Sequence, residues 1–166
     1  RKALPVFTST EALSAWNRDA RPVAADIRRA ALSAVQDGSS LLVVDPASDP
    51  AFVVRRPALW AVAQGREWTP SYRDFAVDDA VTRAAVGIPG IVSAIAEPGR
   101  GVHAVRADAA VLRGGGEGPE LTVSLQLSAG LPESEVRAAV QAFQEALAAE
   151  DIVAENVDSV QVRLTS

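Results

Sequence analysis

The chain has 166 residues, a net charge of −5 at pH 7, no cysteine and a single histidine. The lack of cysteine excludes disulfides, thiol catalysis, zinc–thiolate sites and iron–sulfur clusters, and the acidic balance argues against a large nucleic-acid-binding surface. No stretch reaches the roughly 18 apolar residues of a membrane-spanning helix, and no signal peptide is recognisable. We therefore expect a cytoplasmic protein that binds neither membranes nor nucleic acid.

Residues 1–66 predict a small α+β domain. A strand over residues 4–8 is followed by a capping box that starts a helix over residues 9–16. Asp26 is a suitable N-cap for a second amphipathic helix, which Gly38 ends. A buried strand and its hairpin partner come next, and a third helix closes the domain. These last three elements are expected at Leu41–Val44, Phe52–Val54 and residues 57–65.

The polar segment 67–77 predicts a linker, and residues 78–166 predict a second α+β domain. A helix is expected from Asp78 or Asp79 to Val86, and the longest helix from Pro132 to about Glu150. The expected strands are residues 91–96, 105–112, 121–127 and 160–164. The simplest arrangement of these elements is one antiparallel sheet with two helices on one face. The fold class predicted for the whole chain is α+β, with two small mixed domains.

Three segments in the first half carry a family resemblance: LPVFTSTEAL, LLVVDP and RPALWAVAQGREWTP. In this order they resemble the N-terminal domain of the enhanced-serine-sensitivity (SseB) family of bacteria, over about the first seventy residues. The second half resembles the C-terminal portion of actinobacterial members. The resemblance implies a bacterial two-domain protein with no established enzymatic activity and a family link to serine sensitivity, and it supplies no catalytic residues.

The residue types that perform chemistry are sparse. A catalytic triad would have to use His103, the only histidine, which we expect on the surface or at the edge of a strand. Asp26, Asp45 and Asp49 offer oxygen ligands for a divalent cation, but the segment from Asp45 lacks the glycine and closing glutamate of a calcium-binding loop. Asp45 is better explained as an acceptor of backbone N–H groups in a turn.

Two glycine-rich segments, residues 99–101 and 114–118, invite comparison with phosphate-binding loops. A phosphate-binding loop leads directly into a helix, whereas segment 114–118 precedes a predicted strand. Both segments are therefore predicted to be turns. The sequence predicts no catalytic residue, no cofactor and no metal, and hence a protein that is not an enzyme.

One cluster of aromatic and arginine side chains stands out, because these residue types dominate binding hot spots. The predicted binding surface consists of Arg55, Arg56, Trp60, Trp68, Tyr72 and Arg73. Two alternative roles for this cluster remain open. One is structural, with a tryptophan in the core and a linker pinned to the first domain. The second is stacking on single-stranded nucleic acid, which the net charge opposes.

Two functions follow from these expectations. The first is a protein-interaction module with an unknown protein partner, for which a homodimer remains open. The alternative is a sensor that binds a small molecule, either an amino acid or a metabolite.

Overall fold

The chain folds into two compact units, shown in the computed structural model, which describes residues 2–49, 51–105, 111–113 and 116–165. Unit 1 comprises Arg1–Trp68 and Gly101–Glu117, and unit 2 comprises Thr69–Arg100 and Gly118–Ser166. The two small α+β units agree with the predicted fold class. The division differs from the predicted domains 1–66 and 78–166, because the polypeptide passes from one unit to the other three times.

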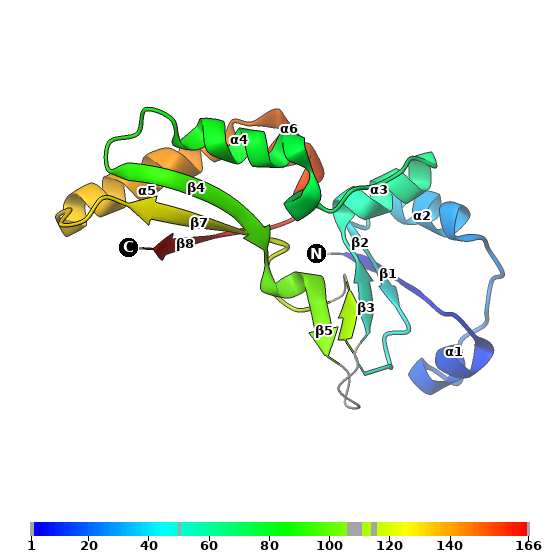
Figure 1. The fold of residues 1–166 in the computed structure, drawn as a ribbon. Helices are drawn as coiled ribbons and strands as arrows, with labels where there is room; N and C mark the ends of the chain where they lie inside the picture. The colour runs from blue at the N-terminus through cyan, green and yellow to red at the C-terminus, as the bar shows by residue number, and fades with distance from the viewer. Residues whose placement is uncertain (1, 50, 106–110, 114–115, 166) are drawn as a thin grey trace. The chain divides into compact units, whose positions relative to one another are not determined.

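Unit 1 is built on a three-stranded mixed sheet with the order β1-β2-β3. Strand β1 pairs in parallel with β2, and β2 pairs antiparallel with β3. Helices α2 and α3 lie side by side on one face of the sheet, while α1 lies apart from them (Figure 1). The elements are β1 (Ala3–Val6), α1 (Thr10–Trp16), α2 (Ile27–Gln36), β2 (Leu41–Val44), β3 (Phe52–Val54) and α3 (Arg56–Gln64).

Local sequence signals explain where the helices of unit 1 begin and end. The Asp26 carboxylate accepts a hydrogen bond from the Arg29 amide at 3.0 Å and so caps the start of α2. Gly38 and Gly65 have φ values of 72° and 66°, the left-handed conformation that stops a helix and favours glycine. The predicted second and third helices and the hairpin of β2 and β3 are confirmed.

A two-stranded hairpin completes unit 1. Strand β5 (His103–Val105) pairs antiparallel with β6 (Val111–Arg113), and Val105 lies opposite Val111. The predicted continuous strand over residues 105–112 is therefore wrong, because its two ends face each other across a hairpin. Residues 106–110 lie outside the described part of the chain.

Unit 2 also has a three-stranded mixed sheet, with the order β4-β7-β8. Its helices α4, α5 and α6 lie on one side of the sheet (Figure 1). Its elements are the 3-10 turn η1 (Ser71–Arg73), α4 (Phe75–Ala85), β4 (Ile91–Pro98), β7 (Leu121–Leu127), α5 (Glu133–Ala148), α6 (Asp151–Asn156) and β8 (Val160–Thr165). A further 3-10 turn, η2 (Arg100–Val102), spans the boundary between the two units.

The prediction of a purely antiparallel sheet is wrong. Strands β4 and β7 pair antiparallel, but β8 pairs in parallel with β7. Two parallel neighbouring strands need a long crossover connection. Helices α5 and α6 provide it, because they return the chain to the end of the sheet at which β7 begins. Helix α6 is absent from the predicted elements, which end the last helix at about Glu150.

The start of α4 also differs from the prediction. The Asp74 carboxylate accepts a hydrogen bond from the Ala76 amide at 2.9 Å, so the helix begins at Phe75 rather than near Asp78 or Asp79. The predicted linker 67–77 consequently contains η1 and the first turn of α4. Within the described residues, no helix has the length and apolar character that a bilayer crossing requires.

Candidate interaction surface

The six residues of the predicted binding surface divide between the two units. Arg55, Arg56, Trp60 and Trp68 belong to unit 1, whereas Tyr72 and Arg73 belong to unit 2. The structure therefore does not gather all six within one unit. Whether they bind a partner stays a prediction, and their local environments give them different roles.

Arg55 holds the hairpin of unit 1. It occupies the N-cap position of α3, and its Nη2 donates hydrogen bonds to the carbonyl oxygens of Gly116 at 3.0 Å and Gly101 at 3.3 Å. These two glycines lie at opposite ends of the segment that carries β5 and β6, so one guanidinium ties both ends to α3. Arg55 is partly buried, and these contacts give it a structural role.

Trp60 and Trp68 are the large aromatic residues of this set that face solvent. Trp60, on α3, keeps 46% of its surface exposed, and Trp68, in the segment after α3, keeps 43%. Within the described residues neither indole contacts another aromatic ring, whereas Trp16 pairs with Phe7 at a centroid distance of 5.4 Å. A half-exposed tryptophan can contribute a large apolar contact together with a hydrogen-bond donor.

Tyr72 and Arg73 are explained by packing within unit 2. The Tyr72 ring packs against the hydrophobic core of that unit, and the Arg73 guanidinium lies 5.8 Å from the centre of the ring, within cation–π range. Truncating Tyr72 would thus remove core contacts as well as any binding contact.

Leu32 is an exposed residue that the predicted binding surface omits. It keeps 45% of its surface exposed on α2, beside the exposed Arg28 and Arg29. The signal is present in the sequence, because Leu32 falls outside the buried apolar stripe of α2, whose innermost members are Ala31 and Ala34. A large apolar residue outside the buried face of an amphipathic helix either contacts another part of the protein or is exposed to solvent.

Asp45 stabilises a turn at the carboxyl ends of β1 and β2. Its two carboxylate oxygens accept hydrogen bonds from the Thr8 amide at 2.9 Å and the Thr8 hydroxyl at 2.7 Å. Its backbone has a φ of 48°, a left-handed conformation that aspartate tolerates better than most residues. The expected role of Asp45 in a turn is confirmed.

The remaining chemical candidates are the possible metal ligands, His103 and the glycine-rich segments. Among the described residues, no three histidine or carboxylate side chains converge as a metal site. His103 begins β5, but its side chain lies outside the described part of the structure. Gly99 approaches the chain closely, since a Cβ there would lie 2.2 Å from the Pro119 carbonyl oxygen. The glycine is explained by this backbone approach.

A buried carboxylate, Glu120, is also absent from the sequence-based candidates. It is 3% exposed, at the start of β7. Its Oε1 accepts a hydrogen bond from the Ser71 hydroxyl at 2.7 Å, and its Oε2 accepts one from the Asp158 amide at 3.0 Å. Because both oxygens have donors within unit 2, Glu120 serves to join η1 to the segment before β8.

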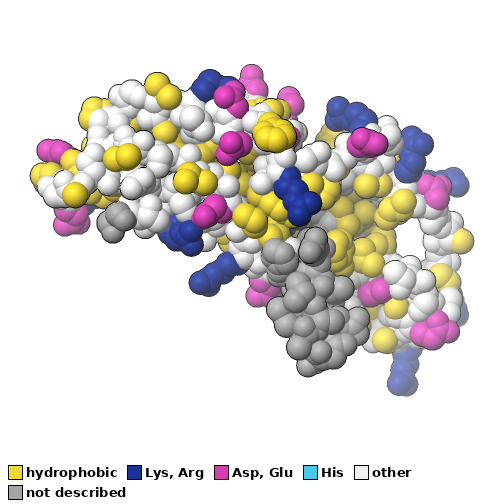
Figure 2. All heavy atoms as spheres, viewed as in Figure 1, with side chains coloured by type: hydrophobic (Ala, Val, Ile, Leu, Met, Phe, Trp, Pro, Cys, Tyr) yellow, Lys and Arg dark blue, Asp and Glu magenta, His cyan; other side chains and the backbone are white. Residues whose placement is uncertain are grey.

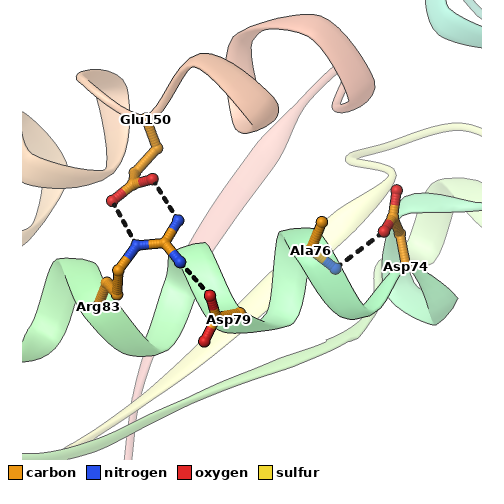
Figure 3. A network of polar contacts seen from close by, with 5 residues as sticks. All are labelled: Asp74, Ala76, Asp79, Arg83 and Glu150. Atoms are coloured by element: carbon orange, nitrogen blue, oxygen red, sulfur yellow. Dashed lines mark hydrogen bonds and ion pairs between the residues drawn. The ribbon is translucent and has the colours of Figure 1, made fainter.

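An ion-pair network lies on the helices of unit 2 (Figure 3). Arg83 on α4 pairs with Asp79 one turn earlier and, at 2.7 Å, with Glu150 before α6. The hydrogen bond from Arg83 holds the pKa of the Glu150 carboxyl below its ordinary value, and the same contact raises the pKa of Arg83. The network connects α4 to the start of α6, and its one arginine is paired with two carboxylates.

The class of protein these features define is a two-unit α+β protein whose described polar clusters have structural roles. Comparison with known proteins adds one positive result. Residues 1–61 match the family model of the SseB protein N-terminal domain, which supports the resemblance to that family over β1 to α3. The resemblance of the second half to actinobacterial members is not supported by this match. No curated protein and no solved structure matches the chain.

Proposed function

We propose that the protein is a non-enzymatic, SseB-type interaction module that binds another protein through unit 1. The observation that carries the proposal is the exposure of Trp60 and Trp68, at 46% and 43%. Tryptophan is enriched in binding hot spots because its large ring, once desolvated, gives much energy per side chain. The link to serine sensitivity is expected from the family name alone. The binding site is proposed from the exposure of the two tryptophans.

Capture experiments test this proposal. Full-length tagged protein is incubated with extract of the organism that encodes it, and bound proteins are identified after crosslinking. We expect Trp60→Ala combined with Trp68→Ala to abolish capture of the main partner. The melting temperature should stay nearly unchanged, because neither residue belongs to the hydrophobic core of unit 1.

A matched control distinguishes this surface from any exposed tryptophan. Trp16 is 47% exposed in the same unit but already packs on Phe7, so Trp16→Ala should leave capture intact. Equal capture by all variants, or loss of capture together with loss of folded structure, would contradict the proposal. Tyr72 is left out of the variant because its ring supports the core of unit 2.

A further inference from the structure

The exposed face of the α2–α3 pair combines apolar side chains with arginines. Arg28, in the first turn of α2, lies against the C-cap of α3, since a Cβ at Gly65 would be 2.9 Å from its guanidinium carbon. The start of α2 is thus beside the end of α3, and the two helices run antiparallel. Together they cover one face of the sheet through their alanine-rich sides.

Two half-exposed apolar residues occur at similar levels of this pair. Leu32 is four residues beyond Arg28, and Trp60 is five residues before Gly65. At a rise of about 1.5 Å per residue these steps advance about 6 Å and 7.5 Å along the two helices. Leu32 is 45% exposed and Trp60 is 46% exposed, so both helices contribute large apolar side chains to the outer surface. Helix α2 also carries Ile27, which is 53% exposed at its first residue.

The charges around these two residues are of one sign. Arg28 and Arg29 precede Leu32 by four and three residues, positions that flank it on a helix surface, and Arg56 precedes Trp60 by four. Neither α2 nor α3 contains a carboxylate. In the part of the chain that the structure describes, Arg28 and Arg29 take part in no ion pair. In the region of α2 and α3, Figure 2 shows basic and apolar side chains together with acidic ones.

The acidic residues next to this face have other contacts or lie outside the helices. Asp26 uses its carboxylate to cap α2, and Asp37 pairs with Lys2 at 2.6 Å. Glu67 follows the end of α3. Unit 1 as a whole holds 11 basic and 9 acidic residues, a net charge of +2, whereas unit 2 holds 5 and 12, a net charge of −7. The chain's acidic character therefore belongs to unit 2.

We propose that the α2–α3 face binds an acidic amphipathic helix of a partner protein, whose apolar residues contact Leu32 and Trp60 and whose carboxylates pair with Arg28 and Arg29. This proposal rests on the proposed function and specifies the partner's chemistry. Helical ligands present apolar anchors every three or four residues, a spacing that suits two anchors on neighbouring helices. A symmetric dimer through this face would bring the arginines of two copies together, which like-charge repulsion opposes.

Selection from a displayed library of helical peptides with randomised surface positions tests the partner's chemistry. The bait is the full-length chain at moderate salt, and peptides that also bind the Leu32→Ser, Trp60→Ala variant are removed. We expect the enriched peptides to combine Asp or Glu with apolar residues three or four positions apart. Their affinity should fall by about tenfold or more for Arg28→Glu, Arg29→Glu.

Arg18→Glu combined with Arg21→Glu is the matched control, because it makes the same charge change at exposed positions outside the two helices. It should weaken the enriched peptides much less. No enrichment, enriched peptides without acidic residues, or equal weakening by both charge reversals would overturn the inference. A dimer that sedimentation detects and that Trp60→Ala abolishes would also overturn it. The proposed function can hold even if this inference fails. It would still stand if capture of a protein partner from extract depended on Trp60 and Trp68.

Discussion

Unit 1 and unit 2 use the same architecture, a three-stranded mixed sheet with helices on one face, but fill it differently. The buried cluster of unit 1 consists of Ala31, Ala34, Leu42, Leu59 and Ala63. That of unit 2 is larger and contains Phe143, Leu121, Leu125 and Leu147 among its members. Hydrophobic stabilisation grows with the apolar area removed from water, so unit 2 has the stronger core.

The difference has a counterpart at the surface. In unit 1 the helices meet the sheet through Ala31, Ala34 and Ala63 and one large side chain, Leu59, while Leu32 and Trp60 remain exposed. All three tryptophans belong to unit 1, while the only tyrosine belongs to unit 2. The unit with the smaller core is thus the one whose indoles are half exposed, and tryptophan fluorescence reports on that unit.

The largest expected effect comes from the core of unit 2. Phe143 is fully buried, so Phe143→Ala should lower the free energy of unfolding of unit 2 by about 3–5 kcal/mol. Urea unfolding followed by far-UV circular dichroism should shift strongly, while the tryptophan fluorescence transition moves much less. If both signals shift together, the two cores do not unfold independently and the comparison fails.

A smaller loss is expected in unit 1. Leu59→Ala removes a fully buried side chain from the cluster that it forms with Leu42 and three alanines. We expect a loss of about 2–4 kcal/mol in the free energy of unfolding, measured by tryptophan fluorescence. Leu32→Ala, a change of the same atoms at a half-exposed position, should cost about 0.5 kcal/mol or less. Similar losses for the two variants would show that Leu32 belongs to the core.

Next comes the polar link within unit 2. Glu120→Ala leaves the buried Ser71 hydroxyl and the Asp158 amide without the carboxylate that accepts their hydrogen bonds. We expect a loss of about 1–3 kcal/mol, measured by urea unfolding with circular dichroism. Glu155→Ala, at an exposed position on α6, is the control and should be nearly neutral. Equal stability of both variants would mean that water replaces the carboxylate at little cost.

The smallest effect concerns the exposed network of Figure 3, and its sign depends on pH. Arg83 lowers the pKa of Glu150 in the folded state, so the pair stabilises the fold at neutral pH, where the carboxylate is charged. Arg83→Met should be slightly less stable than the wild type at pH 7. This difference should disappear as the pH falls through the folded-state pKa of Glu150. A difference that persists in acid would assign the effect to packing of the arginine stem.

Much of the fold is accessible from local sequence signals. Asp26, Gly38 and Gly65 mark helix ends through side-chain caps and left-handed backbone, and the alternation of residues 121–127 specifies β7 over its full length. These signals act within a few residues. The start of α4 is also encoded, by Asp74, but the polar residues around Pro70 suggest a linker instead.

The remaining features depend on contacts between distant segments. The parallel pairing of β7 and β8 and the assignment of Gly101–Glu117 to unit 1 have no local signature. The same holds for the site. Aromatic and arginine composition selects Trp60 and Trp68, which are exposed, but also Arg55, which holds the hairpin, and Tyr72, which packs on a core. Composition identifies candidate binding residues, but only their burial and contacts distinguish the exposed ones from those with a structural role.

The return of Gly101–Glu117 to unit 1 also sets an order for folding on the ribosome. When Trp68 has been synthesised, unit 1 still lacks the hairpin that Arg55 holds, and 49 further residues are needed before Glu117 is made. At roughly 5–20 residues per second this takes about 2–10 s. Throughout this interval the nascent chain presents unit 1 without its last segment, so unit 1 begins to fold first but is completed only after much of unit 2 has been translated.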